Sequence, residues 1–122
     1  MAMKRIILEM GTGNDLYGED YTKAACRAVQ DALHHSSLTL FRSLGLDRDT
    51  MVVNVTVGVQ QPDKVDPAKV ASQIPYGTVN VNVEDGGLNV VDDDAGTTSV
   101  IATVGVEAKL ELPEGQFVLP KA

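Results

Sequence analysis

The amino-acid sequence predicts an α+β fold, in which a small, mostly antiparallel sheet is covered on one side by a single layer of helices. Two observations lead to this prediction. Valine alternates with polar residues in three separate stretches, which is the period of a half-buried strand. Another stretch carries alanine and other apolar residues at helical spacing. The expected order of elements is β-α-β-(α)-β-β.

The first expected strand covers residues 5–10, and a glycine-rich loop, 11–18, follows it. Asp20 is expected to cap the next helix, because its carboxylate can accept unpaired N–H groups of the first turn. The helical pattern runs from residue 22 to about 44, but Ser36 and Ser37 are expected to loosen or end the first helix. Residues 38–44 then form a second short helical piece, and Gly45 ends it. The apolar face of this helix is rich in alanine, so the helix can lie close to the sheet.

The second half of the chain is predicted to be mainly strands. Asp66 and Pro67 are expected to begin a short helix, with Asp66 as N-cap and proline at the first helical position. The expected strands are 50–59, 78–83, 88–91 and 99–111. The length indicates a single domain, residues 1–112, followed by a C-terminal arm, 113–122.

Composition excludes several classes of partner. The formal net charge is −7, which argues against nucleic acid and membrane as partners because both need a basic face. Cys26 is the only cysteine, and no targeting segment is visible, so a cytoplasmic location is expected. No cofactor or metal is expected, because His34 and His35 are adjacent on a helix and point in different directions.

One face of the expected sheet is unusually polar. Asparagine is unfavourable in a strand that only faces solvent. Two interpretations fit: the face is solvated, as in one-sided antiparallel sheets, or it contacts the same face of sister subunits in a closed oligomer. The second interpretation is favoured. The face comprises Asn54, Thr56, Asn80, Asn82, Thr103 and Glu107.

The glycine-rich loop is the candidate functional site. Its glycines permit positive φ angles or close approach of a ligand, and N–H groups at the following helix start can bind an anion. A purely structural loop, fixed by side chains bonding to their own backbone, carries equal weight on spacing alone. The candidate ligand-binding residues are Gly11, Thr12, Gly13, Asn14, Gly18, Asp20 and Lys23.

Three residues in or beside this loop are the candidate catalytic residues. Glu9 ends a strand among apolar residues, an environment that suits a general acid or base, although an outward-facing strand residue is the alternative. Asp15 is expected to position the loop or a ligand. Tyr17 can donate a hydrogen bond to a ligand, or it can simply cover the loop.

Residues 9–18, together with 75–77 and 86–88, resemble a conserved hypothetical family of bacteria and plastids that is marked by the motif GxGxDxHG. This family has no assigned reaction, so the resemblance implies an identity without a function. Tyr17 stands where the family motif has histidine. If that histidine is the family's acid–base group, a phenol replaces it in this chain.

The order of elements and the segment 66–69 resemble the architecture of monofunctional chorismate mutases and reactive-intermediate deaminases. Those proteins are trimers with ligand clefts between subunits, which would account for both the loop and the polar face. Fold analogy does not transfer chemistry. A fainter resemblance to ring-opening amidohydrolases lacks their catalytic Ser-Lys pairs, because Met10 and Asp85 stand at the corresponding positions.

The resulting hypothesis is a cytoplasmic homo-oligomer, with a trimer favoured, that binds or transforms a small metabolite at clefts between subunits. The alternative is a non-catalytic metabolite-binding or structural assembly protein. An enzyme of the ring-opening amidohydrolase type is the less favoured possibility. The sequence does not decide whether the protein is an enzyme.

Overall fold

The computed structural model describes residues 3–34 and 50–111, and within them a mixed sheet of five strands forms the body of the protein. The strand order is β1-β5-β2-β3, and β4 pairs with β5 beyond the end of β2. The pair β2–β3 is parallel and the other pairs are antiparallel, which confirms the predicted α+β class. The strands are β1 Met3–Asp15, β2 Val52–Val59, β3 Thr78–Asp85, β4 Leu88–Asp92 and β5 Thr97–Glu111.

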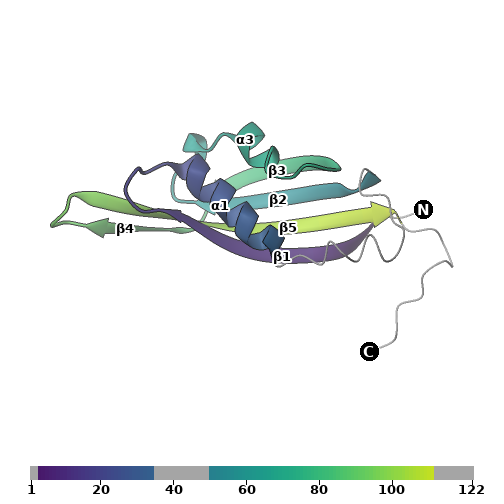
Figure 1. The fold of residues 1–122 in the computed structure, drawn as a ribbon, viewed down its shortest axis with the longest axis horizontal. Coiled ribbons are helices and arrows are strands. Elements are labelled where there is room, and N and C mark those ends of the chain that lie inside the picture. Colours follow the sequence, from purple (N-terminus) through teal and green to yellow (C-terminus); the bar gives the residue numbers. More distant parts are fainter. Residues whose placement is uncertain (1–2, 35–49, 112–122) are drawn as a thin grey trace, which may run out of the picture.

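The helices lie on one face of this sheet (Figure 1). Helix α1, Tyr21–His34, crosses β1 and β5, while α3, Pro67–Ala71, follows the short turn η2, Pro62–Lys64, and packs near β3. The predicted continuation of the helical pattern through residues 35–44 lies outside the described residues, as does the expected C-terminal arm.

The predicted helix starts are confirmed. The Asp20 carboxylate accepts the backbone N–H of Lys23 at 3.0 Å. The Asp66 carboxylate accepts the N–H of Ala68 at 3.1 Å, and Pro67 occupies the first helical position. Each cap satisfies a backbone donor that has no partner within its own helix.

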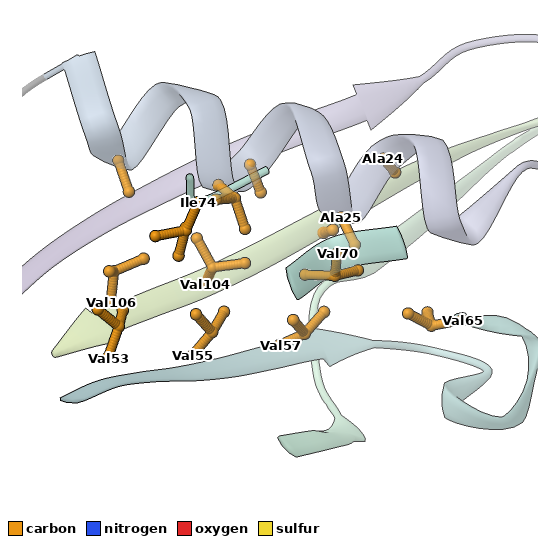
Figure 2. Packing of buried hydrophobic residues seen from close by; sticks show 14 of the residues in the cluster. Ala24, Ala25, Val53, Val55, Val57, Val65, Val70, Ile74, Val104 and Val106 are labelled. Atoms are coloured by element: carbon orange, nitrogen blue, oxygen red, sulfur yellow. The ribbon is translucent and has the colours of Figure 1, made fainter. Parts of the chain in front are cut away.

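The core lies between the helices and the inward face of the sheet, where alternate valines of β2 and β5 point toward α1 and α3 (Figure 2). Val55 and Val104 are among these buried side chains. Alanines on α1, such as Ala25, face them and keep the helix close to the sheet. The predicted valine alternation therefore marks the buried face correctly.

The expected loop at residues 11–18 is wrong in its first part, because Gly11–Asp15 are the last residues of β1. Gly11 and Gly13 face α1. A Cβ atom would lie 2.4 Å from the Ala28 oxygen if it were added at Gly11, and 2.2 Å from the Ala28 nitrogen if it were added at Gly13. These glycines therefore let the helix backbone contact the strand, and α1 occupies the space beside them.

A second close approach carries the chain from β3 to β4. Gly86 crosses the end of β2, where a Cβ atom added to it would lie 3.0 Å from the Gly58 Cα atom. Gly87 has a φ of +64°, in the left-handed region that favours glycine. Before the crossing, β3 pairs with the outer side of β2; after it, β4 lies beyond the end of β2. There β4 pairs with the part of the long strand β5 that β2 does not reach. The resulting β4–β5 hairpin projects beyond the helices (Figure 1).

Candidate functional site

The end of β1, the loop that follows it and the first turns of α1 surround an open cleft of about 510 Å³. The cleft brings together six of the residues predicted as a site, and it adds two others. Its lining residues are Asn14, Asp15, Leu16, Tyr17, Gly18, Asp20, Lys23 and Arg27.

Asp15 lies at the base of this cleft and is only 6% exposed. Its Oδ2 atom accepts the backbone N–H of Asp20 at 2.9 Å, which ties the end of the strand to the start of the helix. A Cβ atom at Gly18 would lie 2.7 Å from the same Oδ2 atom, so the glycine gives the carboxylate room. Glu19 has a φ of +50°, an uncommon conformation for a residue with a side chain.

Two basic side chains reach the cleft from one face of α1. Lys23 and Arg27 are four residues apart, and such residues are neighbours on a helix surface. The Lys23 Nζ atom is 3.9 Å and the Arg27 Nη1 atom 3.7 Å from Asp15 Oδ1. The guanidinium also donates to the Asn14 backbone oxygen at 2.7 Å. Positive charge therefore stands between the buried carboxylate and solvent.

The rim of the cleft is apolar and exposed. The Tyr17 side chain, the residue at the motif's histidine position, is 79% exposed, and its neighbour Leu16 is also exposed. The tyrosine borders the cleft and does not contribute to the hydrophobic core.

Four of the predicted site residues lie outside the cleft: Gly11 and Gly13, which contact the backbone of α1, and also Glu9 and Thr12. Glu9 is half-buried and borders a small apolar space under α1, together with Leu33 and Met51. It is six residues before Asp15 on the same strand, a separation of about 20 Å. Thr12 is exposed, and its backbone N–H donates to Asp31 Oδ2 at 3.0 Å. Neither residue lines the cleft.

Comparison with known proteins identifies a family whose members have no assigned reaction. The model of a family described as conserved hypothetical protein, Lin0512, matches residues 5–108. The chain belongs to the Lin0512 family. A search among curated proteins gives no match.

One solved structure is similar to this Lin0512 family member along most of its length. It is the crystal structure of a protein from Nostoc punctiforme PCC 73102, described as FtsZ-like and of unknown function. The two chains are 34% identical, with a TM-score of 0.79 over 92% of this chain and 99% of the Nostoc chain. The Nostoc protein therefore has the same fold, and neither the family description nor this structure assigns a reaction.

The face of the sheet that is turned away from the helices, here called the open face, carries a hydrogen-bonded row across four strands. Arg5 Nε donates to Glu107 Oε2 at 2.7 Å, and Asn54 donates to Glu107 Oε1 at 3.3 Å. Asn80 in turn donates to the Asn54 side-chain oxygen at 3.2 Å. The Arg5 hydrogen bond, helped by Asn54 and by the charge of Lys109, lowers the pKa of Glu107 below its usual value.

The strand register confirms that the predicted polar residues share this open face. The face also carries apolar side chains that were not expected there. Leu8 and Met10 alternate with the buried positions of β1, and Met10 is 74% exposed. Gly105 lies directly opposite Met10, and nothing lies within 4 Å of the place where its Cβ atom would be.

Other candidate chemistry is weaker. Cys26 packs beside α3, and burial raises the pKa of its thiol, which disfavours the thiolate that acts as a nucleophile. Among residues 3–34 and 50–111, no three histidine, cysteine, aspartate or glutamate side chains are grouped so that they could hold a metal ion. No helix in the same described ranges is long and apolar enough to cross a membrane.

Arg27 is the charged residue among the two cleft residues that the sequence interpretation missed, and Leu16 is the other. The spacing of Arg27 from Lys23 could have indicated a shared site, because both residues lie on the polar side of an amphipathic helix. That helix begins beside the glycine-rich loop. Arg27 was overlooked because charged residues on such a face are usually only solvated.

Proposed function

We propose that the cleft binds a small metabolite, and that the protein works as a cytoplasmic homo-oligomer in which a second copy borders the cleft. The observation that carries this proposal is Asp15, a carboxylate held almost completely out of solvent at the base of an open depression. Burying a carboxylate is unfavourable unless hydrogen bonds and nearby cations compensate. Costly arrangements of this kind are tolerated at functional sites.

The exposed rim supports a shared site. Leu16 and Tyr17 present apolar surface at the mouth of the cleft. Adjoining exposed apolar side chains in a small protein commonly mark a contact surface. A neighbouring copy that covers these side chains would also exclude water from the cleft and provide its missing wall.

The open face supports the choice of a second copy of the same chain. Asn14 lines the cleft, and it follows Met10 and Thr12 along the exposed side of β1, so the open face reaches the cleft. The hydrogen-bonded row contains both signs of charge, Arg5 and Glu107, so this face repels a copy of itself less than a uniformly acidic surface would. A closed ring with repeated contacts of this kind fits the favoured trimer.

Four residues of the cleft have proposed roles here. Asp15 positions the loop and the two basic side chains, and Tyr17 provides a hydroxyl donor to the ligand. Gly18 and Asp20 hold the loop in place around the carboxylate. Glu9, Gly11 and Gly13 are not part of this proposal, because Glu9 borders a different space and α1 packs on both glycines.

A second candidate is a non-catalytic binding or assembly protein. The structural role of Asp15 favours this candidate. The hydrogen bond from the Asp20 N–H to Asp15 accounts for the buried carboxylate without any reaction. The description of the Nostoc relative as FtsZ-like names no substrate for either candidate.

The test is a thermal-shift screen of small metabolites against the wild-type protein and an Asp15→Asn variant. A ligand that stabilises the wild type but not the variant supports a site at the cleft. Recovery of that ligand unchanged after incubation favours the binding protein, and its conversion favours an enzyme. Light scattering completes the test, because a monomer at micromolar concentration contradicts the shared site.

A further inference from the structure

We infer that the ligand of this cleft carries an anionic group, a carboxylate or a phosphate, and that Lys23 and Arg27 bind it. This inference rests on the proposed function, since it assigns the chemical class of ligand at the same cleft. It starts from the two basic side chains that face solvent there, in a chain whose formal net charge is −7.

The two basic groups keep hydrogen-bond donors for a ligand. Their side chains are 53% exposed for Lys23 and 50% exposed for Arg27. The distances to Asp15 Oδ1, 3.9 and 3.7 Å, are long for hydrogen bonds, so the carboxylate attracts both groups without using their donors. Arg27 uses Nη1 for the Asn14 oxygen, and its planar guanidinium has further N–H groups suited to a carboxylate or phosphate.

Asp15 is an anchor for the cations and competes weakly with a ligand. One of its oxygens accepts the Asp20 N–H, and Gly18 closes over that oxygen. An anion that enters from solvent meets the exposed ammonium and guanidinium before it meets the buried carboxylate. The carboxylate keeps the two basic side chains close together, and this reduces the entropy that they lose on binding.

The side chains that line the cleft carry no net charge, although the chain is acidic, because Asp15 and Asp20 balance Lys23 and Arg27. The amino-terminal end of α1 adds roughly half a positive charge, and the exposed Glu19 beside the lining opposes it. Charges on the remaining surface are screened over about 8 Å at physiological salt, so the acidic residues of distant elements contribute little.

The experiment is an amide NMR titration of the wild-type protein with three probes: malonate, inorganic phosphate and malonamide, the uncharged analogue of malonate. We expect malonate or phosphate to shift the amide signals of Gly18 and Lys23, and malonamide to leave them in place. Whichever anion binds more tightly identifies the group that the cleft prefers. Added sodium chloride should weaken the binding of either anion.

Substitutions assign the binding to the two side chains. Lys23→Gln and Arg27→Gln should each weaken binding of the anion about tenfold, because each removes a charge-assisted hydrogen bond. The matched control is Lys69→Gln, which removes an exposed lysine on α3 outside the cleft and should leave the affinity unchanged. Circular dichroism of each variant checks that it is folded.

Three outcomes overturn the inference. The first is that malonamide shifts the same amide signals at the same concentrations as malonate. This result contradicts the preference for a charged ligand, but it does not contradict the proposed small-molecule site. The second is that Lys69→Gln weakens anion binding as much as Lys23→Gln and Arg27→Gln do. The third is that neither malonate nor phosphate shifts the amide signals of the cleft at millimolar concentration. The proposed function is then still tested separately, by the neutral compounds of the thermal-shift screen.

Discussion

Gly13 and Ala28 lie so close together that a Cβ atom on the glycine would stand 2.2 Å from the alanine nitrogen. The neighbouring atoms are helix backbone and cannot turn aside. We therefore expect Gly13→Ala to lower the free energy of unfolding by about 3 kcal/mol, near the upper end for overpacked cores. Urea unfolding followed by circular dichroism measures this loss.

Gly105 provides the matched control, because it lies in the middle of β5 and no atom is within 4 Å of its added Cβ position. Gly105→Ala should leave the free energy of unfolding unchanged or raise it by up to about 1 kcal/mol, since alanine restricts the unfolded chain. Equal losses in both variants would show that α1 does not press on β1 as described.

Asp15 should stabilise the strand-to-helix junction. Asp15→Ala leaves the Asp20 N–H without its acceptor, so we expect a loss of about 1–3 kcal/mol in the free energy of unfolding. The control is Asp93→Ala in the exposed β4–β5 turn, with an expected change within about 0.5 kcal/mol. If Asp15→Ala and Asp93→Ala lost the same free energy of unfolding, the strand-to-helix junction would not depend on the Asp15 carboxylate.

Glu107 should make stability depend on pH in the acidic range. Its pKa is lower in the folded protein than in the unfolded chain, chiefly because Arg5 donates a hydrogen bond to it. The contribution is therefore present above the usual glutamate pKa and is lost as the pH falls through the lowered folded pKa. Urea unfolding at several acidic pH values measures this for the wild type and for Glu107→Gln. The free energy of unfolding should depend less on pH in the variant than in the wild type.

The Arg5 hydrogen bond can be tested separately by carboxyl NMR. Arg5→Gln should move the pKa of Glu107 upward toward its usual value, because the largest cause of its lowering is removed. An unchanged pKa in this variant would mean that Asn54 and Lys109 account for the whole effect.

Met10 tests the proposed contact between copies on the open face. Met10→Lys places a charge on exposed apolar surface of β1, so we expect light scattering to report a smaller molecular mass than for the wild type. Gln61→Lys adds the same charge at an exposed position before η2, and it should keep the wild-type mass. A mass unaffected by Met10→Lys would place the contact on another surface.

Local patterns in the sequence predicted most of the fold. The capping roles of Asp20 and Asp66 depend on residues nearby in the chain, and the alternating valines mark the buried side of β2 and of β5 directly. The expected glycine loop failed because Gly11 and Gly13 have no side chains to show alternation. The reason for these glycines lies in Ala28 and its neighbours on α1, which only the folded structure brings into contact.

The candidate site was predicted in part for a similar reason. Asp15, Gly18 and Asp20 are close in sequence, so the motif alone grouped them. Glu9 was grouped with them by proximity in the chain, but an extended strand separates residues that are close in sequence. Arg27 enters the cleft through the way in which α1 crosses β1, and this depends on packing rather than on a local pattern.

The bonds from α1 to the outer edge of β1 restrict how the sheet can grow. Asp31 binds the Thr12 N–H, and Arg27 binds the Asn14 carbonyl, so an added strand cannot pair with these two groups of the edge. Helix α1 therefore blocks lateral growth of the sheet at the end of β1 that borders the cleft.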